Sequence, residues 1–176
     1  MKIPIICVVL AVITASTSAQ DTLSIEILEF GAYSGRHQHA VADSAAPTSR
    51  VLMEGPVKLI AQTNTIPAVV GRKFGIGFVV KGKPAGKSIP MTVVYRFPKM
   101  VNPKTKREIS EYRASIQAKA GDRKPRMLWD FTEPWELVPG KWTFQIYHSK
   151  QKLAEKSFTV VKQTKKAHQS SRPKSR

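Results

Sequence analysis

The chain is almost free of cysteine. Cys7 is the only one among 176 residues, and it lies in an N-terminal segment that we expect to be removed. Disulfides, thiolate metal sites and cysteine nucleophiles are therefore excluded for the rest of the chain. A domain of this length is large enough to be stabilised by its own hydrophobic core without crosslinks.

Long hydrophobic runs are also scarce. The main one, Ile3 to Ile13, follows Lys2 and is shorter than the roughly 20 apolar residues that a transmembrane helix needs. A positive residue, a short apolar region and then small residues from Thr17 to Ala19 are the pattern of a secretory signal peptide. We therefore predict a signal peptide over residues 1–19, cleaved after Ala19, and a periplasmic or secreted protein with no transmembrane span.

Acidic residues are few, since 12 Asp and Glu stand against 29 Lys and Arg and give a formal net charge of +17. Residues 72–128 hold fifteen cations and three acids, and residues 162–176 hold six cations and no acid. Such asymmetry favours an anionic partner or a solvated basic surface. Outside the cytoplasm the available polyanions are lipopolysaccharide, anionic lipid headgroups and wall polymers, whereas nucleic acid is not an expected partner.

Apolar stripes of helical period are absent, and alternation with period two dominates instead. The clearest runs are Leu23–Ile27, Phe74–Val80, Met91–Phe97, Tyr112–Ala118 and Met127–Phe131, with Val57–Thr63 as a weaker one. Each has one apolar face, as a half-buried strand requires. Turn signals such as Asn102-Pro103 and Gly121-Asp122 separate these runs, so we predict a series of short strands.

The last part of the chain predicts a β-hairpin. Pro139-Gly140 marks a turn, and Trp142, Phe144 and Ile146 then alternate with polar residues. A polar turn follows before a second strand that places Phe158 and Val160 on one face. This pattern is typical of a hairpin that closes an all-β domain, with Trp142 in its core.

The predicted fold is an all-β, immunoglobulin-like sandwich of about seven to nine antiparallel strands in a single domain, residues 21–161. A closed barrel is the alternative, because periodicity does not separate the two. Ala32 to Arg50 lacks alternation and is predicted to be a long loop, which in many proteins is functional or mobile. Residues 162–176 are polar and basic, so we predict a disordered tail.

His37 and His39 are the weak candidates for metal binding. Imidazoles that alternate along the chain, with Asp43 nearby, suit zinc or copper. Two ligands and a distant acid do not complete a site, and His148 and His168 have no evident spatial tie to them. We therefore expect no cofactor, and a metal-dependent enzyme at His37 and His39 is the weakest functional hypothesis.

Other catalytic patterns are equally incomplete. Gly75-Ile76-Gly77 lies within a predicted strand, whereas a phosphate loop must precede a helix, so the glycines indicate a bulge or a close backbone approach. Glu133 and Glu136 flank Pro134-Trp135 in a turn, and proximity in a turn does not supply the gap across a cleft of a glycosidase pair. We expect both acids to face solvent and Trp135 to pack at the sandwich edge. The sequence therefore predicts a protein that is not an enzyme.

A basic surface is the main candidate site. Arg96 and Arg113 lie on the polar faces of two predicted strands, and the connection between these strands carries further cations. If the strands pair, six side chains share one surface that suits a phosphate- or carboxylate-bearing polymer: Arg96, Lys99, Lys104, Lys106, Arg107 and Arg113. The alternatives are a solvated face that only keeps the protein soluble, and an envelope-assembly module that binds another protein through a sheet edge or Ala32–Arg50.

Two stretches resemble a known family. They are the run from Glu133 to Phe144, E-P-W-E-L-V-P-G-K-W-T-F, and Leu153 to Phe158, L-A-E-K-S-F. Phe74–Phe78 and Arg96–Pro103 are similar to the same bacterial family of small exported β-domain proteins, the domain of unknown function numbered 3859. The resemblance covers roughly Leu23 to Val160. It implies a small exported β-domain and supplies no activity, cofactor or catalytic residue.

Overall fold

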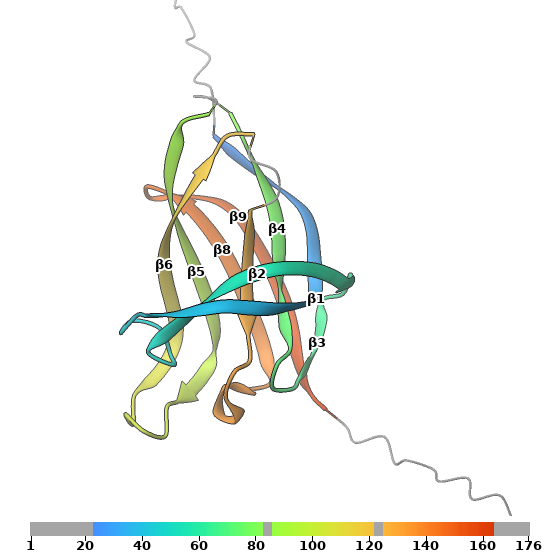
Figure 1. The fold of residues 1–176 in the computed structure, drawn as a ribbon, viewed down its shortest axis with the longest axis vertical. Coiled ribbons are helices and arrows are strands. Elements are labelled where there is room, and N and C mark those ends of the chain that lie inside the picture. The colour runs from blue at the N-terminus through green and yellow to red at the C-terminus, as the bar shows by residue number, and fades with distance from the viewer. Residues whose placement is uncertain (1–22, 83–85, 122–124, 164–176) are drawn as a thin grey trace, which may run out of the picture.

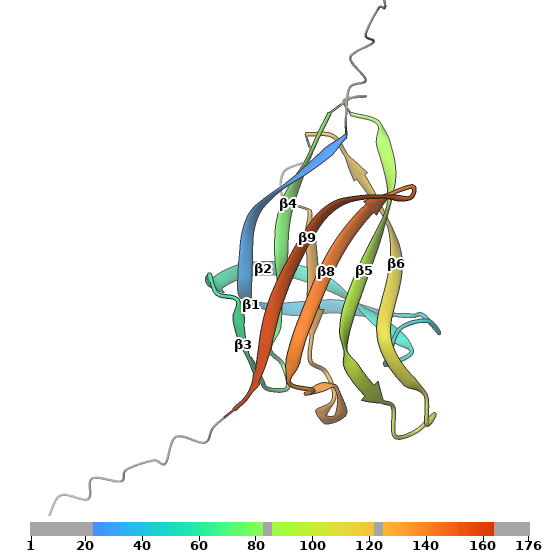
Figure 2. The same cartoon turned by 180° about the vertical axis from the view of Figure 1, so that it is seen from behind.

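The structure, a computed structural model, describes residues 23–82, 86–121 and 125–163, without the side chains of residues 37–39 and 50–54. The predicted signal peptide, residues 1–19, and all but the first two residues of the predicted tail, residues 162–176, lie outside the described residues. Lys162 is the last residue of a strand rather than the start of a tail. Figure 1 shows the arrangement of the described elements and Figure 2 shows it from behind.

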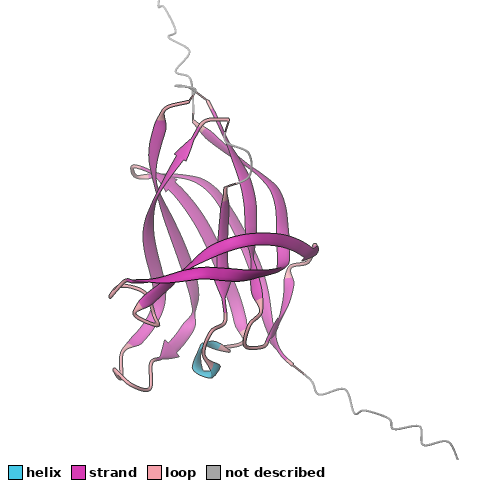
Figure 3. Cartoon of the chain, in the orientation of Figure 1, coloured by secondary structure: helices cyan, strands magenta, loops and turns pink. Residues whose placement is uncertain are grey.

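The described chain forms nine strands in two sheets, together with the short 3-10 turn η1 (Pro134–Glu136), as Figure 3 shows. The four-stranded sheet has the order β2 (Arg50–Ala61), β1 (Ser24–Ala42), β4 (Lys73–Lys81), β7 (Arg126–Asp130). The five-stranded sheet has the order β3 (Thr65–Ala68), β9 (Gln151–Lys162), β8 (Gly140–His148), β5 (Ser88–Val101), β6 (Glu108–Lys119). Two separate sheets confirm the immunoglobulin-like sandwich rather than the closed barrel.

Strand pairing follows the predicted alternation in most of the chain. The predicted hairpin is present, with Trp142 on β8 opposite Phe158 on β9. Tyr95 on β5 lies opposite Tyr112 on β6 and Phe144 on β8. All pairs are antiparallel except β3 and β9, which run parallel. On one side of the sandwich the sheets meet at β1 and β9, where the Lys156 ammonium lies 3.4 Å from the centre of the Phe30 ring.

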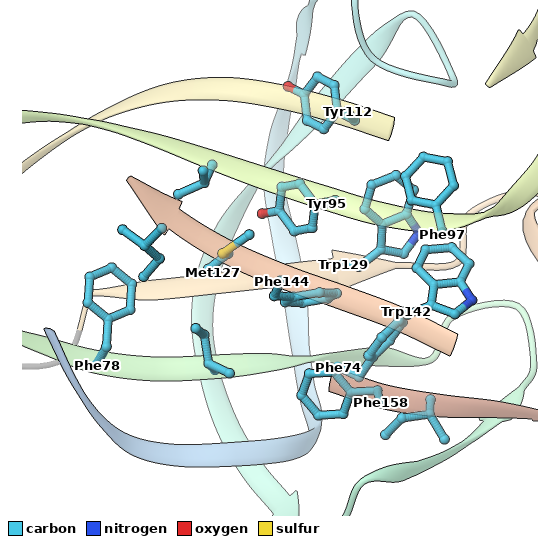
Figure 4. Packing of buried hydrophobic residues seen from close by; sticks show 14 of the residues in the cluster. Phe74, Phe78, Tyr95, Phe97, Tyr112, Met127, Trp129, Trp142, Phe144 and Phe158 are labelled. Carbon is cyan, nitrogen blue, oxygen red and sulfur yellow. The ribbon is translucent and has the colours of Figure 1, made fainter. Parts of the chain in front are cut away.

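Aromatic rings fill the space between the sheets. Phe74 is fully buried, and its ring centre lies 5.3 to 5.6 Å from those of Phe131, Trp142, Phe144 and Phe158. Figure 4 shows Phe74 together with Trp142, Phe144 and Phe158. The Trp142 indole donates a hydrogen bond to the Val138 carbonyl, so its polar atom is satisfied within the core. Trp142 is therefore a core residue, as predicted.

The glycine at position 75 allows a close backbone approach, as the sequence predicts. Gly75 has φ of 158°, and a Cβ there would lie 2.1 Å from the Met127 carbonyl oxygen on the neighbouring strand β7. No side chain fits in that space, so β4 and β7 pair closely only because position 75 has none. The motif serves sheet packing, and no phosphate loop is present at this position.

The predicted long loop at Ala32–Arg50 is wrong for most of its length. Strand β1 continues to Ala42, and only residues 43–49 form the connection to β2. Beyond Tyr33, β1 leaves β4 and pairs with β2 alone, so the described side chains of Ser34–Arg36 and Ala40–Ala42 are exposed. Apolar and polar residues alternate where one face of a strand is buried, and the described side chains of this part of β1 are buried on neither face.

Residues 34–58 form a two-stranded ribbon, the arm, which passes in front of β4 and β7 in Figure 1 and reaches the β5–β6 connection. Its tip, residues 43–49, is held by backbone hydrogen bonds between Asp43, Ala46 and Ser49. Ala46 is 3 % exposed and belongs to the core cluster. The arm therefore connects the four-stranded sheet to the far edge of the five-stranded one.

Candidate functional site

The structure brings the six predicted cations onto one region, made of β5, the β5–β6 connection and β6. Arg96 on β5 lies opposite Glu111 on β6, and Val94 lies opposite Arg113. The expected pairing of these strands is therefore present. The cations differ sharply, however, in what their charged groups contact.

Three of the six cations form ion pairs with two acids on β6. Glu111 accepts from Arg96 Nη2 at 2.9 Å and from Arg113 Nε at 2.5 Å, so one carboxylate joins two guanidinium groups. Lys99 Nζ lies 2.9 Å from Glu108 Oε2. The hydrogen bond with Glu111 raises the pKa of Arg113 above its ordinary value. The three cations are therefore engaged by two carboxylates, which offset most of their charge.

Arg96 continues this polar network across the outer face of the five-stranded sheet. Its Nε donates to Gln145 Oε1 at 3.2 Å, and Gln145 Nε2 donates to Glu155 Oε2 at 2.8 Å. Glu155 also accepts from Lys152 at 2.6 Å, which is the main cause of the lowered pKa of that carboxyl group. The outer face over β5, β8 and β9 is thus cross-linked by its own side chains.

Arg107 has a structural contact that the sequence did not reveal. Its guanidinium donates from Nη1 to the Ser44 carbonyl at 2.7 Å and from Nη2 to the Ala45 carbonyl at 3.2 Å. Both acceptors belong to the arm tip. Arg107 therefore holds the arm against the β5–β6 connection and is not free to bind a polymer in this arrangement.

Two more side chains from this region hold the arm tip. Tyr112 Oη donates to Asp43 Oδ2 at 2.7 Å, and Asn102 Nδ2 donates to the Pro47 carbonyl at 3.0 Å. The hydrogen bond from Tyr112 lowers the pKa of Asp43. Burial, followed by the bond to Asp43, raises the pKa of the Tyr112 phenol. We call Asn102, Arg107 and Tyr112 the cradle of the arm tip.

Lys104 and Lys106 remain as exposed cations, and within the described residues neither forms an ion pair. Strand β8 begins and strand β9 ends at the end of the sandwich that carries the β5–β6 connection (Figures 1 and 2). Lys141, at the start of β8, and Lys162, at the end of β9, are exposed. We call this set, Lys104, Lys106, Lys141 and Lys162, the basic end. Lys141 and Lys162 were missed because only the strand arrangement places the start of β8 and the end of β9 at the same end of the sandwich as the β5–β6 connection, from which β9 is separated by β8 and β5.

The metal hypothesis gains no support. His37 and His39 lie on β1 at positions interrupted by register shifts, and their side chains are not among those the structure describes. Asp43 is occupied by Tyr112 and by the amide of Ala45, and the His148 ring donates to the Pro90 carbonyl. His168 lies outside the described residues. Where side chains are described, no group of three or more His, Cys, Asp or Glu could hold a metal ion.

Glu136 does not face solvent, which corrects one expectation. It is 2 % exposed, and its Oε2 accepts from the amides of Thr132 and Glu133 and from the Thr132 hydroxyl at 2.8 to 2.9 Å. Burial raises the pKa of this carboxyl group. Glu136 therefore stabilises the turn at η1. Trp135 is partly buried and packs against the core, as predicted.

A buried ion pair lies between β4 and β7. Lys73 and Asp130 face each other in the strand register, and their charged groups are 2.5 Å apart with side chains 3 % and 9 % exposed. Lys73 alternates with the apolar residues Phe74, Ile76 and Phe78 of β4, so the sequence gives no sign of this burial. In the part of the chain that is described, no helix has the length and apolar character to cross a membrane.

Comparisons with known proteins agree with this architecture. Over 82 % of its length the chain matches the whole of an immunoglobulin-like protein from Pseudomonas aeruginosa, with 28 % sequence identity and a TM-score of 0.60. No functionally curated protein matches the chain. Residues 22–160 match the family described as a domain of unknown function, DUF3859, which confirms the resemblance drawn from the residues around Trp135 and Trp142. The chain therefore belongs to the DUF3859 family and has an immunoglobulin-like fold.

Proposed function

We propose that the protein is an exported, non-catalytic module that docks an anionic component of the cell envelope with its basic end. The observation that carries the proposal is the placement of Lys104, Lys106, Lys141 and Lys162 at one end of the sandwich, without ion pairs among the described residues. Unpaired lysines keep their full charge for an external anion, and they attract phosphate-bearing surfaces over about a Debye length.

The C-terminal sequence reinforces this end. Strand β9 ends at Lys162, which is part of the basic end. The sequence that follows carries five more cations and no acid. A polybasic segment near an anionic membrane contributes about 1 kcal/mol of attraction per Lys or Arg close to the surface. The tail and the basic end therefore act on the same surface. The four other predicted cations, Arg96, Lys99, Arg107 and Arg113, support the fold rather than the docking.

Binding to vesicles that contain anionic phospholipid tests the proposal. The variant Lys104→Gln/Lys106→Gln/Lys141→Gln should lower affinity on the order of a hundredfold, because about 3 kcal/mol of attraction is lost. The matched variant Lys58→Gln/Lys87→Gln/Lys150→Gln removes the same charge from exposed lysines elsewhere on the domain and should change affinity by less than about threefold. Deleting residues 164–176 measures the contribution of the tail separately.

Salt dependence separates this proposal from its alternative. Docking by lysines should weaken steeply as ionic strength rises. Absence of vesicle and lipopolysaccharide binding at low salt, or equal losses in the two triple variants, would overturn the proposal. Salt-insensitive capture of one stoichiometric envelope protein would instead favour the assembly-module alternative.

A further inference from the structure

The ion pair of Lys73 and Asp130 lies outside the basic end and is removed from water. Lys73 Nζ is 2.5 Å from Asp130 Oδ2, and the two side chains are 3 % and 9 % exposed. A buried ion pair adds little net stability compared with apolar side chains of similar volume, because both charges lose their hydration. Stability alone therefore gives a weak reason for an amine and a carboxyl group at these two positions.

The two strands hold the amine and the carboxyl group against each other. Lys73 and Asp130 lie opposite each other in the antiparallel register of β4 and β7. The pairing continues past them, because the Phe131 amide donates to the Arg72 carbonyl at 3.2 Å. Backbone hydrogen bonds thus fix both positions, and the Lys73 nitrogen lies next to the carboxyl carbon that carries Oδ2. Groups held in contact in this way react as if at a very high concentration.

The neighbours of the pair favour uncharged groups. Tyr33 lies opposite Lys73 on β1 and is 2 % exposed, so three adjacent strands contribute one buried row to the same face of the sheet. Glu136 is a second buried carboxyl group near Asp130: burial is the main cause of its raised pKa, and the charge of Asp130 adds to it. In such surroundings a proton passes from an ammonium to a carboxylate more readily than in water.

We propose that Lys73 and Asp130 become covalently joined by an amide bond between Lys73 Nζ and the side-chain carboxyl carbon of Asp130. Transfer of one proton from the ammonium to the carboxylate first gives a neutral amine and a carboxylic acid. The nitrogen lone pair then attacks the carboxyl carbon, so that the C–N bond forms while the carbonyl electrons move onto oxygen. A proton passes from nitrogen to the hydroxyl oxygen, the C–O bond breaks and the carbonyl re-forms. One water molecule leaves, and the oxidation state of every atom is unchanged.

The product is a crosslink between β4 and β7. It joins two residues that are 57 positions apart, in a chain that has no cysteine beyond Cys7. Closing a long loop lowers the conformational entropy of the unfolded chain, as a disulfide does. An amide also resists reductants, so the crosslink would persist where a disulfide is broken.

The mass of the intact wild-type chain under denaturing conditions tests the crosslink. It should fall below the mass calculated from the sequence of the same purified chain by that of one water molecule. Trypsin does not cut after an acylated lysine, so digestion should release residues 73–81 joined to residues 127–141. Fragmentation of this joined peptide should place the bond between Lys73 and Asp130.

Three variants serve as controls for the mass measurement. Lys73→Arg keeps a positive charge but replaces the amine with a guanidinium group that stays protonated, and Asp130→Ala removes the carboxyl group, so both chains should keep their full mass. Lys99→Arg changes an exposed ion pair with Glu108 and should still lose one water molecule. A wild-type chain with its full mass and separate tryptic peptides would overturn the inference, whether or not the variants fold. Loss of water that persists in Lys73→Arg would also overturn it, because the dehydration would then lie elsewhere.

Discussion

Glu136 is a buried carboxyl group held by three donors rather than by a cation. Its Oε2 accepts all three hydrogen bonds, and burial is the largest influence on its pKa, which is raised. A carboxyl group whose pKa is raised in the folded protein stabilises it fully below the unfolded pKa, and this contribution is lost as pH rises through the folded pKa. Above that range the buried charge opposes folding while the three hydrogen bonds favour it.

The variants Glu136→Gln and Glu136→Ala separate these two effects. Glutamine keeps an acceptor oxygen and removes the charge, so its free energy of unfolding should equal or exceed that of the wild type at neutral pH. Alanine leaves the Thr132 and Glu133 donors without an acceptor and should cost about 2 to 4 kcal/mol. Urea unfolding at neutral and acidic pH measures both. A glutamine variant as unstable as the alanine variant would show that the negative charge itself is required.

The arm is the element that the sequence described least well. Period-two alternation predicts β4 to β9 because each has a buried face, whereas the described arm residues of β1 are exposed on both sides. The cross-strand pair of Arg96 and Glu111 was not predicted either, because it depends on the register of β5 against β6. Alternation therefore predicts which residues enter the core, and it does not predict which charged groups meet at the surface.

Tyr112→Phe tests how the arm is held. Loss of the hydroxyl removes the hydrogen bond to Asp43, and we expect amide hydrogen exchange at Ala46 and Ser49 to become faster by about threefold to tenfold at neutral pH. The pKa of Asp43 is lowered in the folded protein, so this bond stabilises the arm above the unfolded pKa and is lost as pH falls through the folded pKa.

The difference between wild type and Tyr112→Phe should therefore shrink in strong acid. Arg113→Lys is the matched control on β6, because Arg113 contacts Glu111 and not the arm. Unchanged exchange in Tyr112→Phe would contradict the role of Tyr112 in the cradle.

Over the whole molecule, not every cation behind the formal net charge of +17 is available to an external anion. Ion pairs occupy Arg96, Lys99 and Arg113, and the arm occupies Arg107. What remains at the basic end comes from the ends of β8 and β9 and from the β5–β6 connection, which are far apart in sequence. The composition favoured an anionic partner or a solvated basic surface, and the strand order indicates where on the domain an anionic partner would be met.

Lysine acetylation, read by mass spectrometry in the presence and absence of anionic vesicles, tests the docking of the basic end most directly. The account predicts that vesicles lower the acetylation rate of Lys104, Lys106, Lys141 and Lys162 by about fivefold or more, while Lys58, Lys87 and Lys150 remain as reactive as in free protein. High salt should restore the reactivity of the first group. Equal protection of both groups, or protection of Lys58, Lys87 and Lys150 alone, would contradict it.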